Sequence, residues 1–163
     1  EERGQAEAIA KNLMEMSSLK VPIIVVVTGE GGSGGALGIG LGDRIMMLEY
    51  SYYSVSTPEA CAAILWKDVE KAGEAAEALK ITARALRQLK IIDRIIKEPV
   101  GGAHQNPEKA ANLLKEAVLE ELKELAKLSP EELINKRYMK YRQLGVYNYD
   151  AALEGELLKE EVE

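Results

Sequence analysis

Glycine is concentrated in one short stretch of this chain, directly after its longest apolar run. Of the 14 glycines in 163 residues, eight fall between Gly29 and Gly42. The apolar run over residues 23–27 is rich in β-branched side chains, which indicates a strand buried on both faces. A short helix over residues 36–39 is predicted after the glycines. The stretch therefore predicts a strand–turn–helix unit within a parallel or mixed sheet covered by helices.

Hydrophobic periodicity predicts the other elements. Strands are expected over residues 43–49 and 52–56, with an edge strand over 91–96. Helices are expected over residues 3–18, 58–66, 108–128 and 130–144, with two short ones within 72–90. The apolar face of the 108–128 helix consists of Ala111, Leu114, Val118, Leu122 and Leu125. Strands that alternate with helices are typical of an α/β fold.

The extent of the chain predicts one domain. Residues 1–147 are expected to form the domain, and residues 148–163 an acidic tail that is helical or disordered. A helix that leads straight into a buried strand suggests that an earlier strand layer belongs upstream.

Composition excludes several function classes. The formal net charge of −6 argues against nucleic acid as a partner. The longest apolar run is far shorter than the ~20 residues of a membrane span. A single Cys forms no internal disulfide, and one Cys with one His makes no zinc site, so no metal is expected on this chain. Cys61, in an alanine-rich helical stretch, is expected to be a small buried apolar residue rather than a nucleophile.

The glycine-rich stretch fits a packing turn and several kinds of site. Gly29, Gly31 and Gly34 match the dinucleotide-binding pattern G-x-G-x-x-G, and Glu49 lies where a ribose-binding acid is expected. That pattern alone is weak, because further glycines weaken the helix that should follow it. Acidic Glu30, which lies in the stretch, is expected to bond nearby N–H groups.

A serine hydrolase is a second interpretation. Ser33 lies in a G-x-S-x-G pattern, and Asp93 and His104 follow in the chain order of a Ser–Asp–His triad. His104 falls in a glycine-rich loop, where a bond to backbone is the more usual role. Asp43, at the end of the glycine stretch, is expected to bond nearby N–H groups instead of acting in acid–base chemistry.

An oxyanion hole is a third interpretation. Backbone N–H groups at the start of a helix attract negative charge, and glycines let a ligand approach the main chain closely. Such a site needs no side-chain nucleophile, which suits a chain so poor in His and Cys.

A set of longer segments is far more specific than these short patterns. They are residues 1–10 (EERGQAEAIA), 29–44 (GEGGSGGALGIGLGDR), 56–68 (STPEACAAILWKD), 91–93 (IID) and 98–107 (EPVGGAHQNP), with Arg137-Tyr138 and Gln143-Leu144-Gly145 later. Through them, residues 1–147 resemble the carboxyltransferase alpha subunits of multi-subunit acetyl-CoA carboxylases of the bacterial and plastid type. Residues 149–163 carry no such resemblance.

The resemblance implies a crotonase-like fold of stacked ββα units, here its C-terminal part with extra C-terminal helices. It also implies transfer of a carboxyl group from carboxybiotin to acetyl-CoA, which gives malonyl-CoA for fatty acid synthesis. The N–H groups of Gly34 and Gly35 would form the oxyanion hole that faces the biotin ureido oxygen. The carboxybiotin side of the site would include Gly31, Gly32, Ser33 and Ala36.

The partners implied are a beta subunit, in a heterotetramer of two alpha and two beta chains, and a biotin carboxyl carrier protein. The zinc of such an enzyme is expected on the beta subunit, and the location is the cytoplasm or, in a plant, the plastid stroma. Two alternatives stay open at this point: a hydrolase that uses Ser33, and a non-catalytic fragment that folds only within an assembly.

Overall fold

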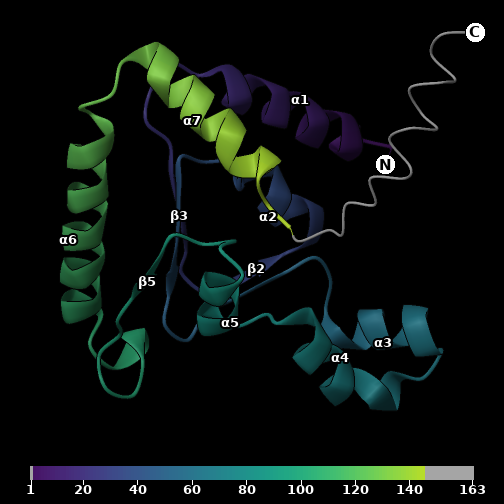
Figure 1. The fold of residues 1–163 in the computed structure, drawn as a ribbon. Helices are drawn as coiled ribbons and strands as arrows, with labels where there is room; N and C mark the ends of the chain where they lie inside the picture. The colour runs from purple at the N-terminus through teal and green to yellow at the C-terminus, as the bar shows by residue number, and fades with distance from the viewer. Residues whose placement is uncertain (1, 146–163) are drawn as a thin grey trace, which may run out of the picture.

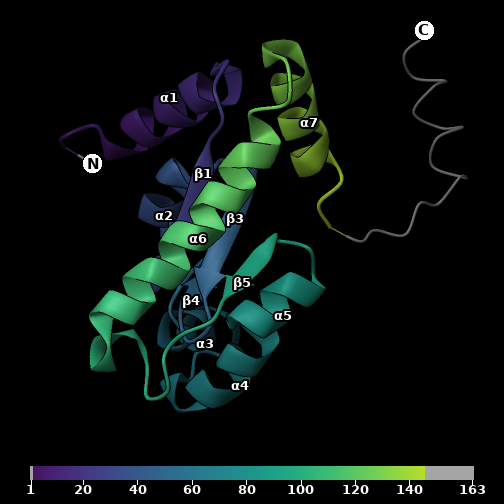
Figure 2. The same cartoon turned by 90° about the vertical axis from the view of Figure 1, so that its left-hand side faces the viewer.

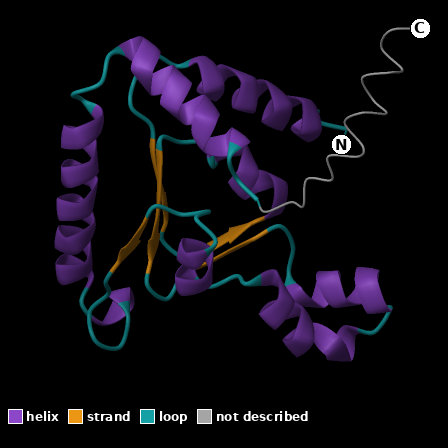
Figure 3. Ribbon diagram, in the orientation of Figure 1, coloured by secondary structure: helices purple, strands orange, loops and turns teal. Residues whose placement is uncertain are grey.

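Two parallel sheets form the centre of the computed structural model, which describes residues 2–145. The larger sheet has the order β1-β3-β5, with β1 over Ile24–Val27, β3 over Arg44–Leu48 and β5 over Arg94–Ile96. The smaller sheet pairs β2 (Glu30–Gly32) with β4 (Tyr52–Ser54). Figure 3 shows the smaller sheet running across the direction of the larger one.

Helices cover both faces of the larger sheet, because successive side chains of a strand point to opposite faces. Met46 and Leu48 of β3 pack with Ala117 of α6 (Pro107–Leu125). Ile45 and Met47 pack with residues of α5 (Ala83–Gln88) on the other face. In Figure 2, α6 crosses in front of the sheet. The near-continuous burial of β3 follows from this double cover.

Three further helices lie close together, and one of them contains the middle of the glycine-rich residues 29–42 (Figure 1). They are α1 (Gln5–Ser18), α2 (Ser33–Ile39) and α7 (Pro130–Arg142). The side chain of Ile9 on α1 lies so close to α2 that a Cβ added at Gly38 would be 3.3 Å from it. The side chain of Asn12 also donates a hydrogen bond to the carbonyl of Gly38. The helix that carries the glycines is thus supported from α1.

Helices α3 (Pro58–Trp66) and α4 (Ala72–Leu79) project from the rest of the fold and share a small core of their own (Figure 1). Thr57 caps α3 by accepting a hydrogen bond from the N–H of Ala60, as expected of a Thr–Pro helix start. Cys61 is 9% exposed within that core, so its predicted role as a buried apolar residue is confirmed. The short 3₁₀ helices Val69–Lys71 and Ala103–Gln105 complete the elements described.

The expected α/β architecture is confirmed, with differences in detail. Strand β2 and the first turn of α2 occupy positions predicted to be a turn, because β2 pairs through its backbone and needs no β-forming side chains. The prediction that residues 23–27 are buried on both faces is wrong: β1 is half-buried, since it lies at one edge of the described sheet.

The predicted face of the long helix is also partly wrong. Leu114 and Val118 pack against the core and Leu125 is buried, as predicted. Ala111 and Leu122 are exposed instead, and Leu113 and Ala117 join the buried face. The edge position predicted for the strand near residue 94 is confirmed by β5. Within residues 2–145 no helix is long and apolar enough to cross a membrane. The tail expected over residues 148–163 lies outside the described residues.

Candidate functional site

A pocket of about 390 Å³ lies between the end of β1, strand β2 and helix α2. Four of the predicted site residues line it together: Gly31, Gly32, Gly35 and Ala36. The side chain of Tyr53 from β4 closes one side. Because these four residues have no side chain beyond a methyl group, the main chain is exposed in their part of the wall, while the side chains of β1 and Ile39 line the rest.

The other two predicted residues line a neighbouring pocket of about 390 Å³. Ser33 and Gly34 face this second pocket, together with apolar side chains that include Leu37 and Val55. Tyr53 lines both pockets, so its ring lies between them. Burial raises the pKa of the Tyr53 phenol above its ordinary 10.0.

The backbone turns sharply where the two pockets meet. Gly32 is extended with φ −141°, and Ser33 is left-handed with φ 51°, an uncommon value for a residue with a side chain. Helix α2 begins at Ser33, and the first N–H groups of a helix have no acceptor within it. Among residues 2–145, no turn or loop hydrogen bond uses the N–H of Gly34 or Gly35.

Close packing accounts for some of the glycines but not for Gly35. A Cβ at Gly31 would lie 2.9 Å from the Tyr53 ring, and one at Gly42 would lie 2.8 Å from Cγ2 of Val25. A Cβ at Gly35 would meet no atom within 4 Å. The packing interpretation is thus correct for Gly31 and Gly42, whereas Gly35 faces open space in the pocket.

The structure does not assemble the serine hydrolase triad. The carboxylate of Asp93 accepts hydrogen bonds from the N–H of Ile45 and from the ammonium of Lys140. His104 lines a different cavity from Ser33, and its ring nitrogen contacts the side chain of Gln105. His104 therefore has no bond to Asp93, and the hydrolase alternative is not favoured.

The dinucleotide interpretation also fails on geometry. Gly31 lies within strand β2 instead of the turn that the fingerprint requires before its helix. The carboxylate of Glu49 is 2.6 Å from the ammonium of Lys97. That bond lowers the pKa of Glu49. The carboxylate expected to bind a ribose is therefore already paired with Lys97.

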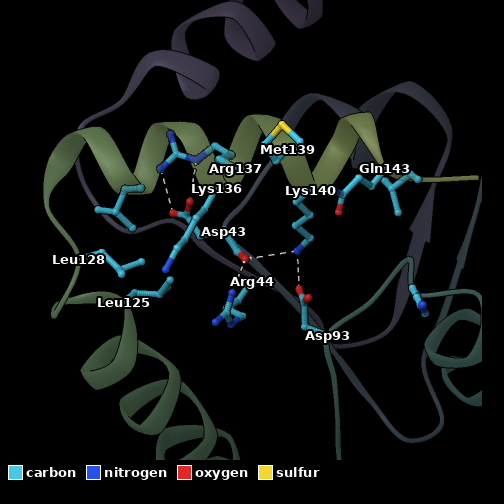
Figure 4. A pocket seen from close by; sticks show the side chains of 13 residues that line it. Asp43, Arg44, Asp93, Leu125, Leu128, Lys136, Arg137, Met139, Lys140 and Gln143 are labelled. Carbon is cyan, nitrogen blue, oxygen red and sulfur yellow. Dashed lines mark hydrogen bonds and ion pairs between the residues drawn. The ribbon is translucent and has the colours of Figure 1, made fainter.

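Paired charges line a third pocket, of about 440 Å³, between β3, α6 and α7 (Figure 4). Arg137 pairs with Asp43, and Lys140 pairs with Asp93. Asp43 also accepts a hydrogen bond of 2.7 Å from the N–H of Ile23, as expected of an acid beside the glycine stretch. Arg137 was missed as its partner, since no sequence signal links positions so far apart. These pairings explain the cluster as a structural one.

No resident metal site is formed by the residues that the structure describes. Within residues 2–145 there is no group of three or more His, Cys, Asp or Glu side chains that could hold an ion. The glycine-rich pocket offers the main-chain N–H groups at the start of α2 as donors. Such donors suit the stabilisation of an oxygen that gains negative charge during a reaction.

Solved structures share this fold. The hetero-dimer of Pseudomonas malonate decarboxylase matches with a TM-score of 0.61 over 97% of this chain and 58% of that chain, at 16% identity. A Pseudomonas malonate decarboxylase hetero-tetramer in complex with coenzyme A gives 0.60 at 18% identity, over 99% of this chain and 60% of the other. The crotonase-like α/β fold predicted from the sequence is confirmed by these matches.

Sequence relatives are far closer than these folds. The chain is 61% identical over 148 residues to the acetyl-coenzyme A carboxylase carboxyl transferase subunit alpha of Acaryochloris marina, covering 91% of this chain and 46% of that protein. It is 62% identical over 145 residues to the subunit of the same name from Geobacter metallireducens, covering 89% and 46%. The chain thus spans about half the length of the curated relatives it matches.

A family model described as acetyl co-enzyme A carboxylase carboxyltransferase-like matches residues 1–145. This match covers all the described elements, from α1 to α7. Together with the two relatives, it shows that the chain belongs to the family of acetyl-CoA carboxylase carboxyltransferase alpha subunits.

Proposed function

We propose that this chain forms part of a carboxyltransferase that moves a carboxyl group from carboxybiotin to acetyl-CoA, which yields malonyl-CoA for fatty acid synthesis. One observation assigns a role in this reaction to a particular residue. Gly35 lines an open pocket in a chain of this family, and packing gives no reason for the absence of its side chain. A main-chain donor with open space before it is what a close-fitting anionic oxygen requires.

The N–H group of Gly35, which lines the glycine-rich pocket, would serve as an oxyanion-hole donor, and the N–H of Gly34, which lines the neighbouring pocket, would be the second donor where the two pockets meet. Carboxybiotin, carried on a biotin carrier protein, would supply the carboxyl group, and its ureido oxygen would lie against these donors. Gly31, Gly32 and Ala36 would form the wall that admits a flat ring close to the main chain. Because Ser33 is left-handed, it would turn the chain so that the first N–H groups of α2 point away from β2.

The remaining machinery is proposed to lie outside this chain. A beta subunit would bind acetyl-CoA and carry the zinc, and two alpha and two beta subunits would form the complex. The residues that the matched relatives have beyond the aligned part would contribute as well, since this chain spans about half their length. The location proposed is the cytoplasm, or the plastid stroma in a plant.

The test is a pair of substitutions at Gly35 in the reconstituted complex, with malonyl-CoA formation as the measurement. Gly35→Pro removes the N–H, and we expect the rate to fall by ~10²–10³-fold, as on removal of one oxyanion donor. Gly35→Ala keeps the N–H but places a methyl group in the open space before it, so it should slow transfer less than Gly35→Pro and separates loss of space from loss of the donor. Full carboxyl transfer by the folded Gly35→Pro complex would show that the donor assignment is wrong.

A second substitution separates this proposal from hydrolysis. Ser33→Gly removes the hydroxyl but tolerates the left-handed backbone. We expect carboxyl transfer to persist, because the proposed donors are backbone groups. Near-total loss of activity in this variant would favour a nucleophilic Ser33 instead.

A further inference from the structure

A further cavity, of about 630 Å³, lies at the carboxyl ends of all three strands of the larger sheet. Thr28 and Gly29 follow β1, Ser51 follows β3, and Glu98 and His104 follow β5. Ligands of open parallel α/β sheets bind outside these ends, where the loops that follow the strands converge. The position of the cavity is therefore one at which this kind of sheet holds a ligand.

The cavity adjoins the glycine-rich pocket. Thr28 and Gly29 line both, so the two spaces lie next to each other at the end of β1. A ligand whose reacting end lies against Gly35 would reach His104 by passing Gly29. The cavity therefore lies beside the proposed site.

The loop that carries His104 is held in one shape. The carboxylate of Glu98 accepts hydrogen bonds from the N–H of Tyr50, at 2.9 Å, and from the N–H of Ala103, at 2.7 Å. Gly102 has φ 99°, and a Cβ there would lie 3.1 Å from Nδ1 of the His104 ring. A side chain at Gly102 would therefore press against the imidazole, which is exposed and lines the cavity.

The lining favours a neutral polar ligand. It contains no lysine or arginine among the described residues, and its one carboxylate, that of Glu98, disfavours phosphates and carboxylates. The hydroxyl of Ser51 donates to the carbonyl of Leu48 at 2.8 Å, which leaves its oxygen able to accept a hydrogen bond. With the His104 ring and glycine main chain, these groups match the donors and acceptors of an amide.

We propose that this cavity binds the amide-bearing chain of a substrate and that His104 is a specificity-determining contact to it. The proposal rests on the proposed function, in which two substrates have such a chain: the biotinyl-lysine arm of the carrier and the pantetheine arm of CoA. The reacting end of that substrate occupies the glycine-rich pocket, and its amide lies beside His104.

The lone histidine provides a direct test. The chain, isotope-labelled on its single His and assembled with unlabelled partner chains, gives one imidazole Cε1–H signal to follow by NMR. Biocytin, which is biotinyl-lysine, is titrated beside free biotin, which lacks the amide. CoA is titrated beside its adenosine bisphosphate part alone, which lacks pantetheine. We expect a saturable shift with biocytin, if the biotin arm binds, or with CoA, if the pantetheine arm binds.

No shift with either amide-bearing probe, or an equal shift with its amide-free counterpart, would overturn the proposal. In kinetics, His104→Ala should raise the KM of the same substrate about tenfold, the effect of one lost hydrogen bond, with kcat nearly unchanged. Val100→Ala is the control, since Val100 is 97% exposed in the same loop and does not line the cavity. An unchanged KM in His104→Ala with a rate loss in Gly35→Pro would reject this inference and leave the proposed function standing.

Discussion

The guanidinium of Arg137 and the carboxylate of Asp43 form a buried, two-pronged ion pair, with Nε–Oδ1 at 2.9 Å and Nη2–Oδ2 at 2.8 Å. The same guanidinium donates to main-chain carbonyls of Met16, Leu19 and Val21. One side chain of α7 thereby fixes the end of α1, the entry to β1 and the start of β3 (Figure 4). Since α1 supports α2, this pair also bears on the position of Gly35.

Replacing Arg137 with Met should strongly destabilise the fold. The substitution leaves Asp43 charged and buried without its partner, a change that typically costs about 3–5 kcal/mol. Urea unfolding followed by circular dichroism measures the loss. Lys127→Ala, which breaks an exposed pair with Glu124, is the control and should leave the unfolding midpoint nearly unchanged. Equal midpoints for the two variants would contradict the structural role of Arg137.

Alanine substitutions should separate Gly31, which packing requires, from Gly35, which it does not. Gly31→Ala forces a methyl group to 2.9 Å from the Tyr53 ring, and we expect a loss of about 1–3 kcal/mol from overpacking. Gly35→Ala enters open space in a helix, where alanine is favoured over glycine by about 1 kcal/mol. Thermal unfolding of both variants tests the difference. A destabilised Gly35→Ala would mean that the pocket beside it is closed.

Most of the fold could be predicted from the sequence because its signals are local. The Thr57 cap of α3 and the apolar run of β3 show directly in the sequence. Strand β2 could not be predicted, since Glu30 to Gly32 have low β-propensity and pair only through their backbone. The buried face of α6 was predicted only in part, because apolar residues occupy more than one side of that helix. Which side is buried depends on its packing against the sheet.

The candidate site likewise has a part that the sequence predicts and a part that it does not. Gly31 and Gly35 are four residues apart in the sequence. The local turn alone brings them into one pocket, so this part of the site could be predicted. The division between Gly35 and Gly34 depends on the Tyr53 ring, which comes from another strand. The closeness of the His104 loop to Gly29 depends on the order of three parallel strands, which periodicity does not give.

Low pH should reduce the stability of the fold because it protonates Glu132 at the start of α7. Hydrogen bonds from the N–H and hydroxyl of Ser129 hold the pKa of Glu132 below its ordinary 4.5. A lowered pKa means that this contribution to stability is present above pH 4.5 and is lost as the pH falls through the lowered value. Glu132→Gln should therefore flatten the decline in urea midpoint below that pH.

Glu131→Gln is the control for this change, because Glu131 lies in the same turn but outside the capping box. It should retain the acid-dependent decline of the unsubstituted chain. If Glu132→Gln and Glu131→Gln gave the same pH profile, the capping box would not be the source of the decline.

Tyr141 should make stability fall in alkali. Its hydroxyl accepts a hydrogen bond of 2.7 Å from the N–H of Gly42 and lies 3.1 Å from the carbonyl of the same residue. Burial is the main cause that raises the pKa of Tyr141 above 10.0. A raised pKa means that this contribution is complete below pH 10.0 and is lost as the pH rises through the raised value.

Tyr141→Phe should then cost about 1–3 kcal/mol near neutral pH, because the N–H of Gly42 loses its acceptor. The same variant should lose less stability than the unsubstituted chain when the pH is raised past 10.0. Tyr138→Phe is the matched control, since Tyr138 lies on the same helix and is 60% exposed. Urea midpoints from neutral to alkaline pH measure both effects, and identical profiles for the two variants would remove Tyr141 as the link between α7 and the glycine stretch.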